Sequence, residues 1–343
     1  MSEKVVDQRV VDQVERDKWK RTLQTLAKDW RLYVLLVPML VFVILLKYRP
    51  IGGILQGFKW HNDPENILGN QWAGLRWAFD LFGDTPYAAD FWRAFRNTFV
   101  NSMYGLIFGF PIPIFLALLF SEIKNQAYRS VLQVCCYLPH FVSAVVVTSI
   151  ITMWCQQATP LNPGGGILYQ VLTAMGALED GRNVLEVPRF FRPIYQVSGV
   201  WEGSGYGSIV YFAAVMAISP TSYEAARIDG ASKLQQIKYV TFPGMAPTLT
   251  IMLIMRIGQI LNIGYEKIIL LVGSKTNTYE TAEVISSWVY NLSGKNPDNP
   301  ISGSTDGLAQ YGIIADLFNS LIAMCLVLGA NAISRRVSST SLF

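Results

Sequence analysis

Charged side chains are scarce in this sequence. Only 15% of the 343 residues are Asp, Glu, Lys or Arg, whereas 51% are hydrophobic, and the mean hydropathy is +0.30. Soluble globular domains carry about 25% charged residues. This balance excludes an ordinary water-soluble fold and indicates a membrane protein.

Histidine and cysteine are also rare, and their placement argues against catalysis by this chain. His61 and His140 are far apart in sequence and have no evident Ser or Cys companion for nucleophilic chemistry, so each is expected to be interfacial or structural. The four cysteines fall in or at the ends of apolar runs without the spacing of metal ligands. We expect small buried hydrophobic cysteines, no catalytic residues and no metal site.

A phosphate-binding loop of the form G-x-x-x-x-G-K-[ST] is missing as well. The nearest match, GSKT at residues 273–276, lacks the upstream glycine and lies in a predicted external loop. The chain is therefore expected to bind no cofactor itself and not to be an enzyme. If ATP powers this protein, ATP must bind a partner.

Long apolar runs are what the sequence has in place of charge. A helix needs about 20 apolar residues to cross a hydrocarbon core about 30 Å thick. Six runs approach that length and predict an all-α membrane protein with six transmembrane helices, although prolines and glycines interrupt several of them. The runs cover residues 32–46, 99–120, 131–155, 197–218, 249–272 and 313–333.

The distribution of Lys and Arg predicts the orientation of these helices. One set of alternate connecting segments carries 15 basic residues in 79 positions, and the other carries 8 in 122. The denser set comprises residues 1–31, 121–130, 219–245 and 333–343, and the sparser set comprises 50–94, 156–193 and 273–311. The denser side is expected to be cytoplasmic. Both termini then lie inside, and the net charge of +4 reflects topology rather than nucleic-acid binding.

Residues 1–29 precede the first apolar run and alternate charged with apolar side chains. Val10 and Val14, and likewise Trp19, Leu23 and Leu26, are spaced at helical steps. This pattern predicts an amphipathic helix along the cytoplasmic face, with a partly disordered tail as the alternative. Residues 30–343 are expected to form the membrane domain.

A polar stretch, YEAARIDGASKLQQIKYVTFPG at residues 223–244, lies between two apolar runs in the predicted cytoplasmic connection 219–245. Ser222 is expected to cap a short helix that carries Glu224 in its first turn. Gly230 permits a sharp change of direction, and Pro243 is expected to end the element before the next membrane helix.

This stretch resembles the EAA signature of the membrane subunits of binding-protein-dependent ABC importers: EAA, three residues, G, nine residues, then I-x-L-P. Here the signature reads EAA at residues 224–226, Gly230 and VTFP at residues 240–243, with Val240 and Phe242 in place of Ile and Leu. The whole chain is similar to maltose-type sugar permeases. GVWEGSGYG and LNIGYEKIILL are most similar to the LplB-like branch, which is associated with complex or uronate-bearing oligosaccharides.

The resemblance implies a multi-pass permease subunit of the bacterial cytoplasmic membrane that imports an oligosaccharide. In that family the EAA loop forms a coupling helix on the ATPase. The implied partners are a second, similar permease, an ATPase dimer that binds ATP and Mg²⁺, an extracytoplasmic solute-binding protein and membrane lipid, with no nucleic acid. The implied coupling residues are Glu224, Ala225, Ala226, Asp229, Gly230 and Pro243.

Polar residues inside the fourth run are candidates for the substrate pathway, because such groups are costly to expose to lipid. Glu202 lies in WEGSGYG, where three glycines permit an irregular backbone lining a cavity. The resemblance places Gly203 and Tyr206 at sugar-site positions of maltose-type permeases, whereas Glu202 stands where that family is apolar. The alternative for Glu202 is an acid paired with a basic residue, or one facing water at the outer mouth.

The fifth run adds a polar set at steps of three residues, which would share one helical face. Amide and aromatic groups suit sugars, whose hydroxyls need hydrogen-bonding partners and whose C–H faces stack on rings. A hydrogen-bonded seam between helices is the alternative. Glu266 and Lys267 could pair with each other or with a neighbouring subunit. The polar set consists of Arg256, Gln259, Asn262 and Tyr265.

Two rival functions remain open at this stage. A secondary transporter driven by an ion gradient would need internal repeats and a buried relay of charges, for which Glu202 and Arg256 are the main candidates. An ABC importer subunit for a non-sugar solute, such as an amino acid or an anion, is the other.

Overall fold

The computed structural model describes residues 25, 28–60, 71–273, 276–293 and 308–337. Almost all of the predicted amphipathic segment 1–29 lies outside these residues, as does His61. Every named element within the described residues is a helix. Two isolated β-bridges, Lys59 with Trp72 and Thr159 with Asn162, are the strand-like pairings in this part of the chain. The predicted all-α class therefore agrees with the structure.

Four helical segments in the described part of the chain are long and apolar enough to cross a membrane. A fifth joins them if the bent pair at residues 126–155 counts as one span. The six-span prediction is thus matched only in part and stays a prediction. The four segments are Trp30–Phe58, Pro86–Glu122, Lys233–Gly258 and Ala309–Arg336.

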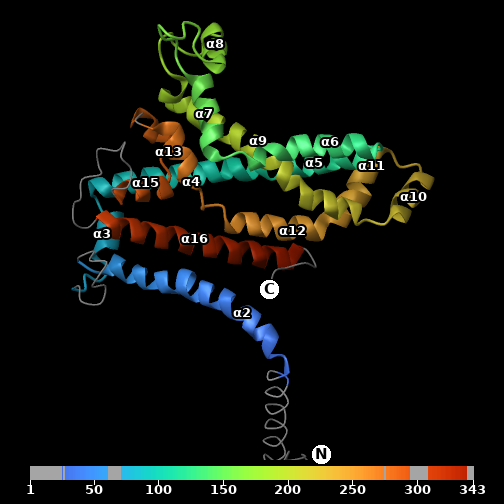
Figure 1. Ribbon diagram of the computed structural model, residues 1–343, viewed down its shortest axis with the longest axis horizontal. Helices are drawn as coiled ribbons and strands as arrows, with labels where there is room; N and C mark the ends of the chain where they lie inside the picture. Colours follow the sequence, from blue (N-terminus) through green and yellow to red (C-terminus); the bar gives the residue numbers. More distant parts are fainter. Residues whose placement is uncertain (1–24, 26–27, 61–70, 274–275, 294–307, 338–343) are drawn as a thin grey trace, which may run out of the picture.

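Helix α9, Pro188–Met216, is the central element of the bundle. It carries the fourth predicted run but is too polar to qualify as a span by composition alone. It packs on α4 (Pro86–Gly109) and α5 (Pro111–Glu122) on one side and on α12 (Phe242–Gly258) on another. Figure 1 shows α9 running between these helices. Its polar residues are therefore covered by other helices or face the spaces between them.

The third predicted run forms a sharply bent pair rather than a straight helix. Helix α6 (Gln126–Tyr137) and the turn η3 (Leu138–Phe141) are followed by α7 (Ala144–Cys155) at an angle of 91°. Pro139 in η3 cannot continue the α-helical ladder, and the Ser143 hydroxyl accepts a hydrogen bond from the Val146 amide to begin α7.

Helix α9 passes very close to α6. A Cβ atom added at Gly205 would lie 1.9 Å from the carbonyl oxygen of Cys136, so only glycine fits this crossing. Contrary to expectation, two of the four cysteines, Cys135 and Cys325, are exposed in the single chain; Cys155 is buried. They lie on helix faces that no other described element covers.

Helix α2, Trp30–Val43, stands apart from the bundle. It continues through η1 (Ile44–Tyr48) and η2 (Arg49–Phe58), and none of its most apolar window is buried. In Figure 1 it runs along the edge of the molecule, beyond α16. A helix with apolar side chains on every face and no covering element is suited to lipid or to another membrane subunit.

Most of the remaining helices lie at the end of the bundle that holds the start of α9, whereas α16 runs along the bundle (Figure 1). Buried side chains of α3, α4, α15 and α16 form one core there, and those of α7, α8, α9, α13 and α14 form another. These helices are α3 (Arg76–Phe82), α8 (Ile167–Ala174), η4 (Val184–Glu186), α13 (Glu266–Val272), η6 (Thr276–Thr278), α14 (Tyr279–Ala282), α15 (Ile285–Leu292) and α16 (Leu308–Val337).

Candidate functional site

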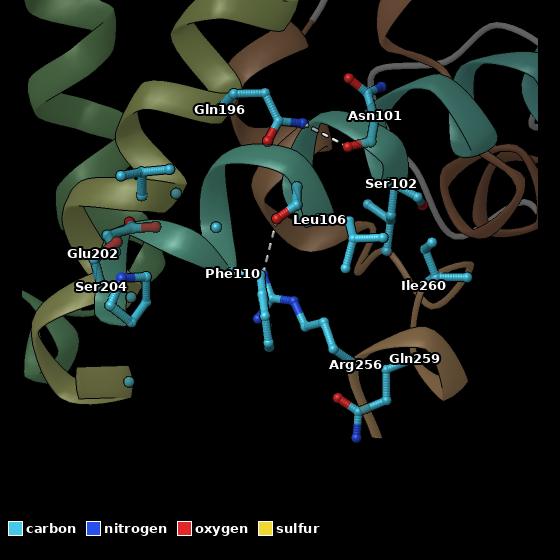
Figure 2. A pocket seen from close by; sticks show the side chains of 18 of the residues that line it. Asn101, Ser102, Leu106, Phe110, Gln196, Glu202, Ser204, Arg256, Gln259 and Ile260 are labelled. Atoms are coloured by element: carbon cyan, nitrogen blue, oxygen red, sulfur yellow. Dashed lines mark hydrogen bonds between the residues drawn. The ribbon is translucent and has the colours of Figure 1, made fainter. Parts of the chain in front are cut away.

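A cavity of about 540 Å³ lies between α4, α9 and α12 (Figure 2). Five of the seven predicted pathway residues line it: Glu202, Gly203, Arg256, Gln259 and Asn262. The cavity is thus assembled from three predicted runs, the second, the fourth and the fifth, and the second contributes residues of α4 that the sequence did not single out.

Glycines create much of this space. Gly199 and Gly203 on α9 line the cavity, and a Cβ atom added at either would meet nothing within 4 Å. On α4 there is less free space, because a Cβ atom added at Gly109 would lie 2.7 Å from Nη2 of Arg256. Gly109 therefore makes room for that guanidinium group.

Arg256 is the cavity's unpaired charge. It lies in the last turn of α12, where a cation is favoured by the helix dipole, and Nη2 donates to the carbonyl oxygen of Gly105 at 3.3 Å. Its side chain extends from α12 toward Phe110 (Figure 2). Within the described residues it forms no salt bridge with a carboxylate. A guanidinium group in this state can bind a carboxylate through two parallel hydrogen bonds.

Glu202 and Lys267 form an ion pair across the cavity wall. Nζ of Lys267 lies 2.5 Å from Oε2 of Glu202, and their side chains are 14% and 22% exposed. The pair joins α9 to α13, and Lys267 lies 5.6 Å from the ring centroid of Tyr195. The paired-acid alternative for Glu202 therefore holds, and Lys267 does not pair with Glu266. Since Glu202 and Lys267 together carry no net charge, Arg256 leaves the cavity lining with a net charge of +1.

Uncharged polar groups complete the lining. The Gln196 amide donates to the backbone carbonyl of Asn101 at 2.8 Å (Figure 2). Both side-chain amide atoms of Asn101, and the hydroxyls of Ser102 and Ser204, are buried without a hydrogen-bond partner among the described residues. Buried polar groups need such partners, so these atoms can bind water or the hydroxyls of a bound molecule. Asn101 and Ser102 were not among the predicted pathway residues, although their polarity inside an apolar run was a usable signal.

The predicted helical face from Arg256 to Tyr265 is wrong. Helix α12 ends at Gly258, and the chain runs irregularly until α13 begins at Glu266. Side chains of two other helices hold this break: Asn319 donates to the carbonyl oxygen of Leu261 at 3.1 Å, and Ser286 donates to that of Ile263. Partners distant in sequence thus stabilise an irregular backbone that local periodicity cannot reveal.

Two predicted pathway residues lie outside the cavity lining. Tyr265 stacks on Tyr290 with ring centroids 4.6 Å apart. Tyr206 stacks on His140, the histidine at the bend between α6 and α7, with centroids 4.0 Å apart and planes inclined by 7°. Both tyrosines are about half exposed in the single chain.

The predicted coupling segment forms two short helices at the opposite end of α9 (Figure 1). Helix α10, Pro220–Ile228, begins earlier than predicted, with Ser219 rather than Ser222 at the N-cap. Pro220 explains the difference, because its fixed φ and missing N–H suit the first helical position. Glu224 is therefore in the second turn, not the first.

Gly230 turns the chain after α10. It adopts φ +76°, a left-handed conformation that favours glycine, and its amide donates to the carbonyl oxygen of Arg227 at 3.0 Å. Ser232 and Gln235 then form a capping box that begins α11, Lys233–Gln236. Glycine at this position thus fits the predicted change of direction.

Pro243 does not end a helix, contrary to the prediction. Lys233–Gly258 is one continuous span in which Ile237–Thr241 forms a π-helical turn immediately before Pro243. The Phe242 amide donates to the carbonyl oxygen of Ile237. The wider turn accommodates the missing N–H and bulky ring of the proline without breaking the helix.

The coupling segment is anchored at its base and exposed at its tip. Lys233 forms an ion pair with Glu122 at the end of α5 at 2.6 Å, and the Tyr223 hydroxyl lies 3.0 Å from that of Thr241. Ile228 and Leu234 are 87% and 79% exposed. A segment that is held to the bundle and exposes apolar side chains is suited to contact with another protein surface. The predicted residues Glu224, Ala225 and Asp229 are exposed on it, and Ala226 is half-buried.

Comparison with known proteins identifies close relatives of the whole chain. The profile described as "Binding-protein-dependent transport system inner membrane component" matches residues 109–339. Protein LplB of Bacillus subtilis (strain 168) is 31% identical over 321 residues, which cover 94% of this chain and 93% of that protein. The polygalacturonan/rhamnogalacturonan transport system permease protein YteP of the same organism is 30% identical. That match covers 96% of this chain and 95% of YteP.

Solved structures show the same likeness. This chain is similar to one from the crystal structure of a bacterial ABC transporter involved in the import of the acidic polysaccharide alginate, with a TM-score of 0.77 and 34% identity. The match covers 93% of this chain and 100% of the other. A second crystal structure shows a bacterial alginate ABC transporter with its periplasmic protein bound to an alginate pentasaccharide, and it matches with the same score and identity.

Proposed function

Because this chain belongs to the inner-membrane component family of binding-protein-dependent transport systems, we propose that it imports an acidic oligosaccharide as one permease subunit of an ATP-driven transporter. The observation that carries the proposal is Arg256, a cation without a carboxylate partner among the described residues, in a cavity lined by amides and hydroxyls. A carboxylate-bearing sugar supplies both the missing anion and the hydroxyls.

The relatives support this substrate class. YteP is named for polygalacturonan and rhamnogalacturonan transport, and the first structural neighbour is involved in the import of the acidic polysaccharide alginate. Under this proposal Arg256 binds a uronate carboxylate, while Gln259, Asn262 and the buried Asn101 bind hydroxyls, directly or through water.

The proposed energy source is ATP bound with Mg²⁺ on a separate ATPase dimer. The exposed tip of α10, with Glu224, Ala225 and Ala226, docks on the ATPase, and the turn at Asp229 and Gly230 transmits its movement to α12. Because α11 continues into α12, a displacement of the segment shifts the helix that carries Arg256. This is a rigid-body form of alternating access.

The proposed assembly completes the pathway and the membrane cover. A second, similar permease supplies the other half of the pathway and covers the bare faces of this chain, while a solute-binding protein delivers cargo from outside. Six spans with both termini in the cytoplasm place the coupling segment inside. In that arrangement α9 counts as a span, its polar residues facing the pathway rather than lipid.

The test is uptake of trigalacturonate by cells that express the full transporter. Arg256→Gln is expected to raise the apparent KM at least tenfold, because one charge-assisted pair contributes about 1.5–3 kcal/mol. Arg256→Lys is expected to retain part of the affinity, since it keeps the charge and loses the bidentate geometry.

The same assay separates the rival functions. The proposal expects uptake to stop when the co-purifying ATPase is inactivated by substitution of its phosphate-loop lysine. Uptake that survives this change but collapses with a protonophore would instead establish a secondary transporter. Undiminished transport of trigalacturonate by Arg256→Gln would refute the assigned role of Arg256.

A further inference from the structure

A second groove of about 540 Å³ lies on another side of the α4–α9 contact. It shares Gln196 and Val200 with the first cavity, so the two are adjacent. One wall is aromatic and apolar, and Tyr104 and Phe108 stack there with ring centroids 6.3 Å apart. The other wall, from α9, carries Arg189 and Arg192.

These arginines stand where positive charge is unfavourable. Arg189 lies in the first turn of α9, at the positive end of the helix dipole, and Arg192 follows one turn later. The positive charge of Arg96 on α4 also acts on Arg192, and the carboxylate of Glu280 acts on it in the opposite sense. Two arginines near the positive end of α9, with the charge of Arg96 added from α4, repel one another, and an anion bound among them would relieve that repulsion.

No described carboxylate fills that role. Nearby Arg93, by comparison, forms salt bridges with Asp90 at 2.8 Å and Glu283 at 2.6 Å. Arg96, Arg189 and Arg192, by contrast, form no salt bridge within the described part of the chain. Positive charge is therefore concentrated at the groove without a salt-bridged carboxylate among the described residues.

Arg192 is held rigidly in place. Its Nη2 donates to Oδ1 of Asn97 at 2.8 Å, and Asn97 is fully buried. The Asn97 amide in turn donates to the backbone carbonyls of Glu280 and Glu283, each at 3.0 Å. Nε of Arg192 is buried without a partner among the described residues. A guanidinium group fixed in this way, with donors still free, is preorganised for a ligand.

We propose that Arg189 and Arg192, supported by Arg96, form an outer anion subsite that binds a second carboxylate of the cargo. This rests on the proposed import of an acidic oligosaccharide. The groove is adjacent to the cavity of Arg256, and its aromatic wall suits the C–H faces of a sugar ring. The subsite lies at the start of α9, opposite the coupling segment (Figure 1), and so on the predicted external side. Cargo then meets Arg192 before Arg256.

The experiment compares trigalacturonate with its fully methyl-esterified form, which has the same backbone without the carboxylates. Arg192→Gln in the full transporter is expected to raise the apparent KM for trigalacturonate about tenfold and to leave the ester unaffected; tenfold corresponds to about 1.4 kcal/mol. Arg192 is partly buried, so its substitution also removes the contact to the buried Asn97. Arg189→Gln provides a second variant, because the Arg189 side chain is exposed and makes no such contact.

Arg182→Gln is the matched control. Arg182 belongs to the same external connection but lies outside the groove, exposed and paired with Glu179 at 3.5 Å. It is expected to transport both sugars normally. Equal KM changes for acid and ester in Arg192→Gln, or no change in either Arg192→Gln or Arg189→Gln, would overturn the subsite.

Direct binding separates this proposal from the proposed function. Trigalacturonate is titrated onto the assembly in nanodiscs, where binding is expected to weaken in Arg192→Gln and to persist in Arg182→Gln, even if uptake itself fails. Native mass spectrometry of the same nanodiscs detects the competing occupant. Phosphatidylglycerol that is retained by the unsubstituted chain and lost from Arg192→Gln, with sugar binding unchanged, would assign the arginines to a lipid headgroup and overturn the proposal.

Discussion

At the scale of single residues, Gly230 and Gly109 show two different uses of glycine. Gly230 is exposed, has nothing within 4 Å of its missing Cβ, and is constrained by φ +76° alone. Gly109 has no unusual φ and is constrained by the Arg256 guanidinium group. The EAA pattern identifies the first glycine from the sequence, whereas the second acquires its role only when α12 packs on α4.

Gly230→Val is expected to uncouple the transporter. A β-branched residue in a left-handed conformation costs about 1–2 kcal/mol, so the chain relaxes and α10 changes its direction relative to α12. The expected result is normal membrane insertion with cargo-stimulated ATP hydrolysis reduced severalfold, measured on the co-purified assembly.

The matched control for this variant is Gly181→Val. Gly181 has φ +82° and an equally open surrounding, but lies in the predicted external connection. It is expected to leave ATPase stimulation intact. Normal stimulation in Gly230→Val, or equal losses in both variants, would contradict a specific coupling role for the turn.

At the scale of elements, an ion pair and hydrogen bonds hold the short α14–α15 connection against α4. Arg93 pairs with Glu283, Asn97 donates to its backbone, and the Thr98 hydroxyl accepts a hydrogen bond from the Ile285 amide at 2.9 Å. Burial raises the pKa of the Glu283 carboxyl, and the negative charge of Asp90 raises this pKa further. The ion pair with Arg93 acts in the opposite direction and lowers it. The connection thus depends on a carboxylate kept charged by a single arginine.

Arg93→Gln is expected to destabilise the protein in a pH-dependent way. Without Arg93 the pKa of Glu283 rises further, so the folded state holds its proton more tightly than the unfolded state and stability falls as the pH increases. Breaking a buried pair costs up to about 3–5 kcal/mol, and the partial exposure of Arg93 reduces this figure. The melting temperature in detergent is expected to drop by several degrees at pH 8 and much less at pH 5. An equal drop at both pH values would contradict this account.

At the scale of the whole molecule, the exposed apolar surface defines how the chain is used. Helix α2 has no buried residue, and large apolar side chains of α5, α7 and α16 are also exposed. Such a surface is suited to lipid and to other membrane subunits, in agreement with the inner-membrane family to which the chain belongs. The proposed topology further requires that the polar helix α9 cross the membrane.

Single cysteines on either side of α9 test this topology. Leu161 is 99% exposed in the connection before α9, and Ser222 is exposed in the segment after it. Leu161→Cys is expected to react with a membrane-impermeant maleimide in intact spheroplasts, and Ser222→Cys only in inverted vesicles. The unsubstituted chain supplies the background. Labelling of both positions from the same side would show that α9 does not cross, and reversed labelling would contradict the cytoplasmic coupling segment.

The sequence by itself determined the class of protein, the polar connection that carries the EAA signature, and most of the charged cavity residues. These follow from hydropathy, from a motif of fixed spacing and from the rarity of charge in apolar runs, all of which are local properties. Only the tertiary structure decided that the helix breaks after Gly258, that Lys267 rather than a solvent ion neutralises Glu202, and that Arg192 rests on Asn97. Each depends on groups between about 60 and 100 residues apart in the chain, whose contacts are set by how helices pack and not by any local pattern.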